Sequence, residues 1–77
     1  MAATELIVTW HHYRTVPVRS GTTGHCVHGG RAWFARHGLD FGAFVRHGLP
    51  ASTFEATGDA LALALVEHAR KEVERGQ

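Results

Sequence analysis

Apolar residues recur at helical spacing in two long stretches of this chain, and glycines separate the segments between them. The first stretch runs from about Cys26 to His37, where a narrow, mostly aromatic stripe predicts a helix. Gly29 and Gly30 cost about 1 kcal/mol each inside a helix relative to alanine, so we expect another backbone to pack closely there. The stripe consists of Cys26, Gly30, Trp33 and His37, with Phe34 beside it.

The second stretch predicts a helix from about Gly58 to Arg75. Thr57 is its expected N-cap, and Asp59 in the first turn complements the helix dipole. Arg70, Lys71 and Arg75 do the same near the other end. Its expected buried stripe is Leu61, Leu65, Ala69 and Val73, widened by Ala62 and Val66.

Short elements are expected between these helices. Gly38 ends the first helix, and Asp40 is a good N-cap for a short helix that carries Phe41, Phe44 and Val45. Gly48 ends this short helix. Pro50 then begins a single turn that reaches Phe54.

The N-terminal segment has a different pattern. Glu5–Thr9 is a short β-branched run and the best strand candidate. Trp10–Arg14 either continues this strand or forms a helical turn capped by Thr9, and Pro17 ends both versions. Arg19–Gly24, with two glycines and three hydroxyl side chains, is expected to be a loop.

The pattern therefore predicts a mainly α fold with minor β: a small helical domain of three to four helices with a short N-terminal β-strand. We expect residues 1–77 to form a single domain, with the strand and loop in 1–24 and the helical unit in 25–77. A core of this size yields only about 3–5 kcal/mol of net stability. Pairing into a homodimer or docking onto a partner would add to it.

The distribution of charge limits the possible functions only moderately. The net charge is +1, but residues 1–50 carry +3 and residues 51–77 carry −2. This excess is too mild for an obligate nucleic-acid binder, and it is wrong for an acidic DNA mimic. The longest apolar stretch, Ala60–Val66, is too short to cross a membrane, and nothing resembles a secretory signal. We expect a soluble cytoplasmic protein with no membrane association and with weak or no direct nucleic-acid binding.

His25-Cys26-Val27-His28 is the one cluster that resembles a set of metal ligands. Zinc needs four donors, and no second pair with a recognised spacing is present, so the expected state is a cysteine packed as a small hydrophobe. Cys26 near a helix N-terminus could also be reactive, but so small a domain rarely builds the cleft that a nucleophile needs. We therefore expect no metal, no cofactor and no catalytic residue.

Aromatic and arginine side chains are the better candidates for function. The seven aromatic residues are interleaved with arginines, and arginine outnumbers lysine seven to one. Trp, Tyr and Arg are the residues most enriched at protein–protein hot spots. Most of the aromatic residues are expected in the core, with Trp10 and Tyr13 the ones left outside. The predicted partner-binding residues are Trp10, Tyr13, Arg14, Arg31, Arg36 and Arg46.

A helix-turn-helix is a further interpretation of residues 26–47, with Arg46 facing a DNA groove. Its second helix would be only about two turns long, and it presents Phe41, Phe44 and Val45, which the core needs. Few polar side chains remain to contact base edges. The sequence therefore favours a DNA-binding regulator less than a protein-binding module.

One pattern resembles a group of small proteins that phages and prophages of GC-rich bacteria encode, most without an assigned function. It covers roughly residues 24–70. In size and style the chain also resembles anti-CRISPR proteins. This resemblance implies a non-enzymatic inhibitor in the host cytoplasm. It would bind a type I CRISPR surveillance (Cascade) complex and block the engagement of target DNA by this complex. The alternative is a phage virion or morphogenesis accessory protein. The pattern comprises Cys26, Gly29, Arg31, Trp33, Phe34, Arg36–Phe41, Gly48–Pro50 and Ala56–Ala62.

Overall fold

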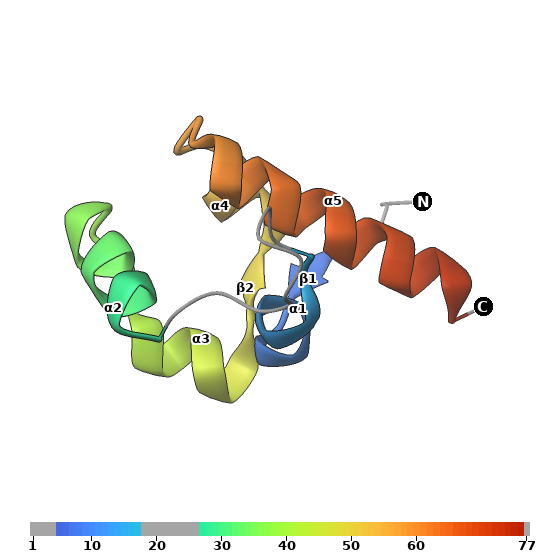
Figure 1. Ribbon diagram of the computed structural model, residues 1–77, viewed down its shortest axis with the longest axis horizontal. Helices are drawn as coiled ribbons and strands as arrows, with labels where there is room; N and C mark the ends of the chain where they lie inside the picture. Colours follow the sequence, from blue (N-terminus) through green and yellow to red (C-terminus); the bar gives the residue numbers. More distant parts are fainter. Residues whose placement is uncertain (1–4, 18–26, 77) are drawn as a thin grey trace.

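The computed structural model describes residues 5–17 and 27–76, with the backbone alone at Val27 and His28. This part of the chain is mostly helical, with a short two-stranded sheet, which confirms the predicted mainly α class with minor β. In Figure 1, α5 crosses one side of the molecule, α1 and α3 lie on the other, and α2 lies at one end. The elements are β1 (Ile7–Val8), α1 (Trp10–Thr15), α2 (Val27–Arg36), α3 (Phe41–His47), β2 (Leu49–Pro50), α4 (Ala51–Glu55) and α5 (Ala60–Arg75).

The described part has five helices, against the expected three to four, because two short segments both form helices. One is α4, the turn expected after Pro50. The other is α1, which resolves the choice left open for Trp10–Arg14 in favour of a helix. The backbone N–H of Thr9, just before α1, donates to Nδ1 of His12 at 3.0 Å. This bond is half of a capping box, in which the third helical residue reaches back to the cap.

The sheet pairs the predicted N-terminal strand with a partner that the sequence did not indicate. β1 and β2 are antiparallel, with Ile7 opposite Pro50 and Val8 opposite Leu49. Gly48 precedes β2 with φ 76°, and a Cβ there would lie 2.8 Å from the carbonyl oxygen of Val8. The glycine therefore lets the end of α3 approach β1 closely, and the sheet ties the N-terminal segment to the α3–α4 junction.

The turn between α2 and α3 follows the prediction closely. Gly38 has φ 69°, and its N–H donates to the carbonyl of Ala35 while the N–H of Leu39 donates to that of Phe34. These two bonds form a Schellman motif, which satisfies the last carbonyls of a helix. The carboxylate of Asp40 accepts from the N–H of Ala43 at 3.0 Å and caps α3, as expected.

The expected cap of α5 is wrong by two residues. Thr57 donates its hydroxyl to the carbonyl of Phe54 and accepts the N–H of Asp59, so it closes the end of α4. Asp59 is the N-cap, and its Oδ1 accepts from the N–H groups of Leu61 at 2.8 Å and Ala62 at 3.3 Å. Asp59 has extended backbone angles, so α5 begins at Ala60 and not at Gly58.

The core is built around three phenylalanines from three helices, Phe34, Phe44 and Phe54, whose rings pack at centroid distances of 5.2–5.9 Å. The opposite wall is the buried face of α5, which consists of four of the six residues that were predicted to be buried. Leu61, at the edge of this face, is 61% exposed, and Val73, in the last turn of the helix, is 45% exposed. The buried residues of α5 are Ala62, Leu65, Val66 and Ala69.

The buried face of α2 also differs from the predicted stripe. It is centred on Gly30 and Phe34, while Trp33 is half-buried and His37 is exposed. Gly30 faces a side chain and not the expected backbone, because a Cβ at this position would lie 1.9 Å from the hydroxyl of Tyr13. The predicted boundary near residue 24 falls outside the described residues.

Candidate protein-binding surface

Four of the predicted partner-binding residues are exposed arginines on the three helices α1–α3. No carboxylate of the described residues forms an ion pair with any of them. The arginines of α5 behave differently: Arg70 lies 3.8 Å from Glu55 and 3.7 Å from Glu67, and Arg75 pairs with Glu72. The unpaired cations of the described chain thus include Arg14, Arg31, Arg36 and Arg46.

Phe41 connects two of the predicted residues. The half-buried Trp10 packs edge-on against Phe41 at a centroid distance of 5.9 Å. The guanidinium carbon of Arg31 lies 5.8 Å from the centroid of the same ring, a cation–π contact. Sequence reasoning placed Phe41 wholly in the core and missed it, because nothing in the pattern showed that one edge of this ring stays at the surface.

The expectation that Tyr13 lies outside the core is wrong. Its side chain is only 3% exposed, its ring stacks on Trp10 at 5.2 Å, and it packs against Phe44 at 5.9 Å. The cause is the helical conformation of α1, which puts residues three apart on one face and directs Trp10 and Tyr13 together against α3. Trp10 is the outer member of the pair and is half-buried.

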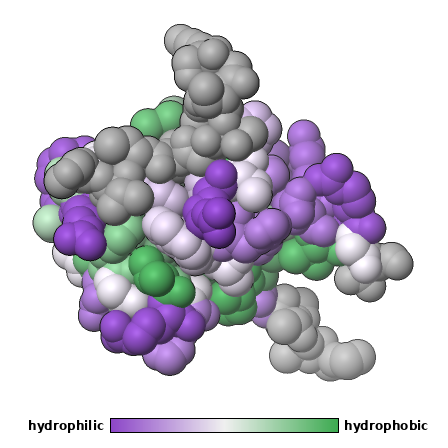
Figure 2. All heavy atoms as spheres, turned by 60° about the horizontal axis from the view of Figure 1, so that its bottom comes forward, coloured by the Kyte–Doolittle hydropathy of each residue, from purple (hydrophilic) through white to green (hydrophobic). Residues whose placement is uncertain are grey.

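Arg14 and Arg46 extend this cluster on both sides. Arg14 follows Trp10 by four residues on α1 and so shares its face. The guanidinium of Arg46 lies over Gly42, where a Cβ would be 3.2 Å from its Nη1, at the edge of a shallow hollow between α2 and α3. In Figure 2, which brings the α3 side forward, green apolar surface lies between purple hydrophilic side chains. We call the set Trp10, Arg14, Arg31, Phe41 and Arg46 the α1–α3 surface.

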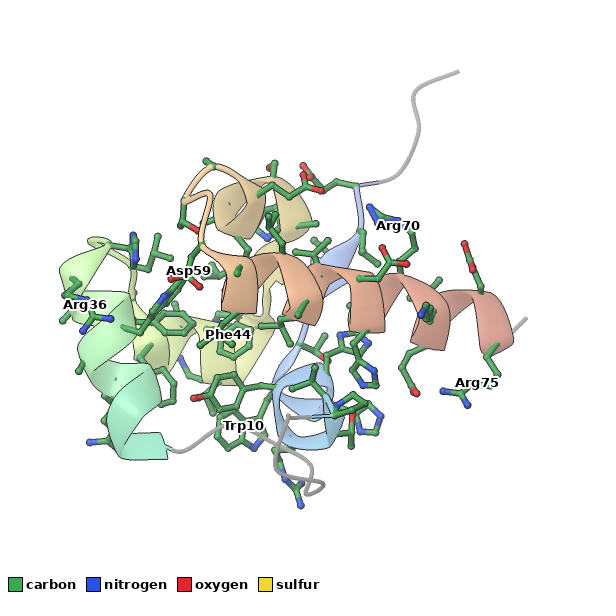
Figure 3. The ribbon with its side chains drawn as sticks, turned by 45° about the horizontal axis from the view of Figure 1, so that its top comes forward. Trp10, Arg36, Phe44, Asp59, Arg70 and Arg75 are labelled. Carbon is green, nitrogen blue, oxygen red and sulfur yellow. The ribbon has the colours of Figure 1, made fainter. Side chains whose placement is uncertain are left out.

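Arg36, the remaining predicted residue, is placed apart from this surface. It lines a groove of about 280 Å³ between α2 and α5. On one side of this groove, the indole N–H of Trp33 donates to Oδ2 of Asp59 at 3.1 Å, and this hydrogen bond lowers the pKa of the Asp59 carboxyl. Figure 3 shows Asp59 between the two helices. Sequence reasoning did not find this groove, because it assigned Leu61 on its rim to the core.

A histidine network joins α1 to α5 on another side of the molecule. His12 is buried, and its ring lies 6.3 Å from that of His68 and 5.8 Å from that of His11. His68 Nε2 and the hydroxyl of Thr15 are 2.8 Å apart, which adds a polar contact between the two helices. Burial lowers the pKa of His12, and the neighbouring His11 and His68 lower it further.

The proposed chemistry of His25-Cys26-Val27-His28 cannot be placed, since His25 and Cys26 lie outside the described residues and the next two are described by backbone only. Elsewhere in the described chain, no three His, Cys, Asp or Glu side chains are grouped as metal ligands.

Of the helices in residues 5–17 and 27–76, none has the length and apolar character that a membrane crossing requires. Comparisons with family models, with curated proteins and with solved structures give no match.

Proposed function

We propose that this protein is a non-enzymatic inhibitor that acts by binding another protein. The observation that carries this proposal is the α1–α3 surface, where exposed arginines without a described carboxylate partner lie beside half-buried aromatic rings. Arginine and tryptophan dominate the energetics of protein interfaces because a planar guanidinium and a large ring gain much contact area on binding. An unpaired guanidinium can also form a bidentate bond with a partner's carboxylate.

The proposed target is a type I CRISPR surveillance complex in the host cytoplasm, with inhibition by blocking its engagement of target DNA. The resemblance to small phage proteins and to anti-CRISPR proteins supports this target. The distribution of charge supports a protein partner over a nucleic acid, because the chain has a net charge of +1 and its C-terminal part is acidic. A nucleic-acid binder usually concentrates a strong basic excess on one face.

The test is an affinity capture with the tagged protein from cells that express a complete type I effector complex. We expect the complex to co-purify, and an equimolar amount of the protein to abolish its binding to target DNA. Arg31→Glu should weaken capture at least tenfold, or about 1.4 kcal/mol. Lys71→Glu makes the same charge change on the exposed surface of α5 and should leave capture unchanged.

Two results would contradict the proposal. Failure of the wild-type protein to capture the effector complex would exclude the target, and equal losses for Arg31→Glu and Lys71→Glu would exclude the α1–α3 surface as the binding site. Recovery of the protein in purified phage particles, without capture of the complex, would instead support the alternative role as a virion accessory protein.

A further inference from the structure

We propose that the groove between α2 and α5 holds a bulky apolar side chain from an acidic segment of the partner protein. This inference rests on the proposed protein-binding function and names the chemistry of the partner. The groove lies apart from the α1–α3 surface, so it would give the partner a second point of contact. It is lined by Tyr13, Gly29, Gly30, Trp33, Phe34, Arg36, Phe54, Leu61, Ala62 and Leu65.

The size and walls of the groove suit a side chain. Its volume of about 280 Å³ is at the lower limit of pockets that enclose small molecules, which span about 300–1,000 Å³. Apart from Tyr13 and Arg36, the described residues that line the groove have apolar or aromatic side chains or are glycines. An apolar anchor inserted into such a pocket is the usual centre of a protein interface, because it is fully desolvated there.

The exposed surface beside the groove indicates an extended occupant. Leu61 lines the groove and is 61% exposed, so apolar surface continues from the groove onto the outside of α5. Residues 60–66, the first two turns of this helix, consist only of alanine, leucine and valine. A compact molecule held inside the groove would leave this surface exposed, whereas a peptide segment would cover both.

The main polar groups at the rim already have partners. The Trp33 indole N–H donates to Oδ2 of Asp59, and the other oxygen of this carboxylate accepts the N–H groups of Leu61 and Ala62. An apolar side chain can therefore enter beside Trp33 without leaving this donor or this carboxylate unsatisfied. Such orphaned groups would cost about 1–3 kcal/mol each.

Charge complementarity indicates which kind of residue should flank the apolar side chain of the partner segment. The α2 wall and its following turn, residues 27–39, contain no aspartate or glutamate. Arg36 lines the groove and forms no ion pair with a described residue. The α5 wall is uncharged over residues 60–66, and the Asp59 carboxylate is engaged by three N–H groups. An acidic residue on the α2 side of the anchor would therefore face Arg36.

The experiment is an NMR titration of the ¹⁵N-labelled full chain with three synthetic peptides. The first has a central phenylalanine–leucine pair between aspartates and glutamates, the second replaces this pair by alanines, and the third replaces the acids by lysines. We expect the first peptide alone to shift the Trp33 indole resonance and the amides of Gly29 and Leu61. Saturating binding of the alanine or the lysine peptide at the same concentration would overturn the proposal, as would no shift with the acidic apolar peptide.

Matched variants test the location. Leu61→Asp should weaken binding of the first peptide at least tenfold, while Leu63→Asp should not, because Leu63 is also exposed on α5 but does not line the groove. Arg36→Ala should weaken binding severalfold, and Lys71→Ala should not. Equal effects within either pair would overturn the assignment to the groove. Shifts of the same resonances with protein concentration alone would show a second copy as the occupant and would also overturn it.

Capture of the effector complex separates this inference from the proposed function. Leu61→Asp should weaken capture at least tenfold. Capture that is unaffected by Leu61→Asp but lost in Arg31→Glu would overturn the groove as an anchor site and leave the proposed function standing. Peptide binding at the groove without capture of the complex would support the groove as a binding site for an acidic apolar segment. It would contradict the CRISPR surveillance complex as the target.

Discussion

Gly30 shows how one missing side chain permits the contact between α1 and α2. Any Cβ at this position would lie 1.9 Å from the hydroxyl oxygen and 2.9 Å from Cζ of Tyr13, which is itself buried. Alanine is a better helix former than glycine by about 1 kcal/mol, but overpacking a core costs about 1–3 kcal/mol. We therefore expect Gly30→Ala to lower the free energy of unfolding by up to about 2 kcal/mol, measured by urea denaturation.

Gly29→Ala is the matched control, since this glycine is the preceding residue of the same helix and is exposed. Because this position is exposed, the helix propensity of alanine should dominate, and we expect stability to rise by up to about 1 kcal/mol. Two substitutions of the same kind at adjacent positions should thus have opposite signs. A stabilised Gly30→Ala variant would contradict the close packing of Tyr13 on α2.

At the scale of elements, the two aspartate caps differ in the number of N–H groups that their carboxylates accept. Asp40 accepts one backbone N–H, from Ala43, and Asp40→Ala should cost about 1 kcal/mol. Asp59 accepts two backbone N–H groups and the indole N–H of Trp33, so it both caps α5 and joins this helix to α2. Thermal and urea unfolding should show that Asp59→Ala costs about 1–2 kcal/mol more than Asp40→Ala. Equal losses would mean that the Trp33 bond contributes nothing.

The contact of α1 with α5 should depend on pH through His12. The buried ring accepts the N–H of Thr9 at Nδ1, which requires the neutral form, and it faces His11, His68 and, more remotely, Glu72. Because burial lowers its pKa in the folded state, the unfolded chain, with an ordinary pKa of 6.5, takes up the proton first on acidification. We expect the free energy of unfolding to decrease as the pH falls below about 6.5 and to recover above it.

His12→Gln isolates this effect. Glutamine at the third helical position is a usual acceptor in a capping box and does not titrate, so the cap remains while the proton site is removed. Denaturation at a series of pH values from neutral to mildly acidic should give a flatter stability profile for the variant than for the wild type. An identical slope in the two proteins would show that His12 does not determine the acid sensitivity.

Elements with strong local signals could be predicted from the sequence, and those that depend on distant contacts could not. The ends of α2 and α3 were predicted within one residue, because Gly38, Asp40 and Gly48 determine them through neighbouring backbone. The cap of α5 was misplaced, because Thr57 and Asp59 are both good cap residues and only the structure of the α4–α5 turn selects between them. β2 gives no signal of its own, since two residues that include a proline form a strand only by pairing with β1.

The candidate site could also be predicted only in part. The exposure of the arginines follows from their charge, since an unpaired guanidinium is costly to bury. The role of Phe41 and the groove beside Leu61 depend on how helices from distant parts of the sequence meet, which local periodicity does not encode. On α5, leucine, alanine and valine fill all sides of the first two turns, so the pattern could not indicate which leucine would face outward.

Across the whole molecule, the charges separate into two kinds of surface. On α5, each arginine has a glutamate partner, so this face presents a nearly compensated field. On α1–α3, the described arginines have no such partner, and their field extends into solvent. This asymmetry should accelerate association with an acidic partner at low salt and slow it as screening increases, without defining specificity by itself.

The same asymmetry bears on DNA binding, the remaining interpretation of α2 and α3. Each phosphate contact contributes about −0.9 to the slope of log affinity against log salt concentration, so four arginines allow a slope no steeper than about −4. We expect fluorescence anisotropy with labelled duplexes of unrelated sequence to give equal and weak affinities, within the nonspecific range of about 10⁻⁴–10⁻⁶ M. A nanomolar affinity confined to one sequence would require base contacts from α3, and its loss in Arg46→Ala would favour a DNA-binding regulator over the proposed inhibitor. Because α3 directs Phe41 and Phe44 towards the core and a neighbouring helix, it has few side chains left for base edges, and the affinity should stay low.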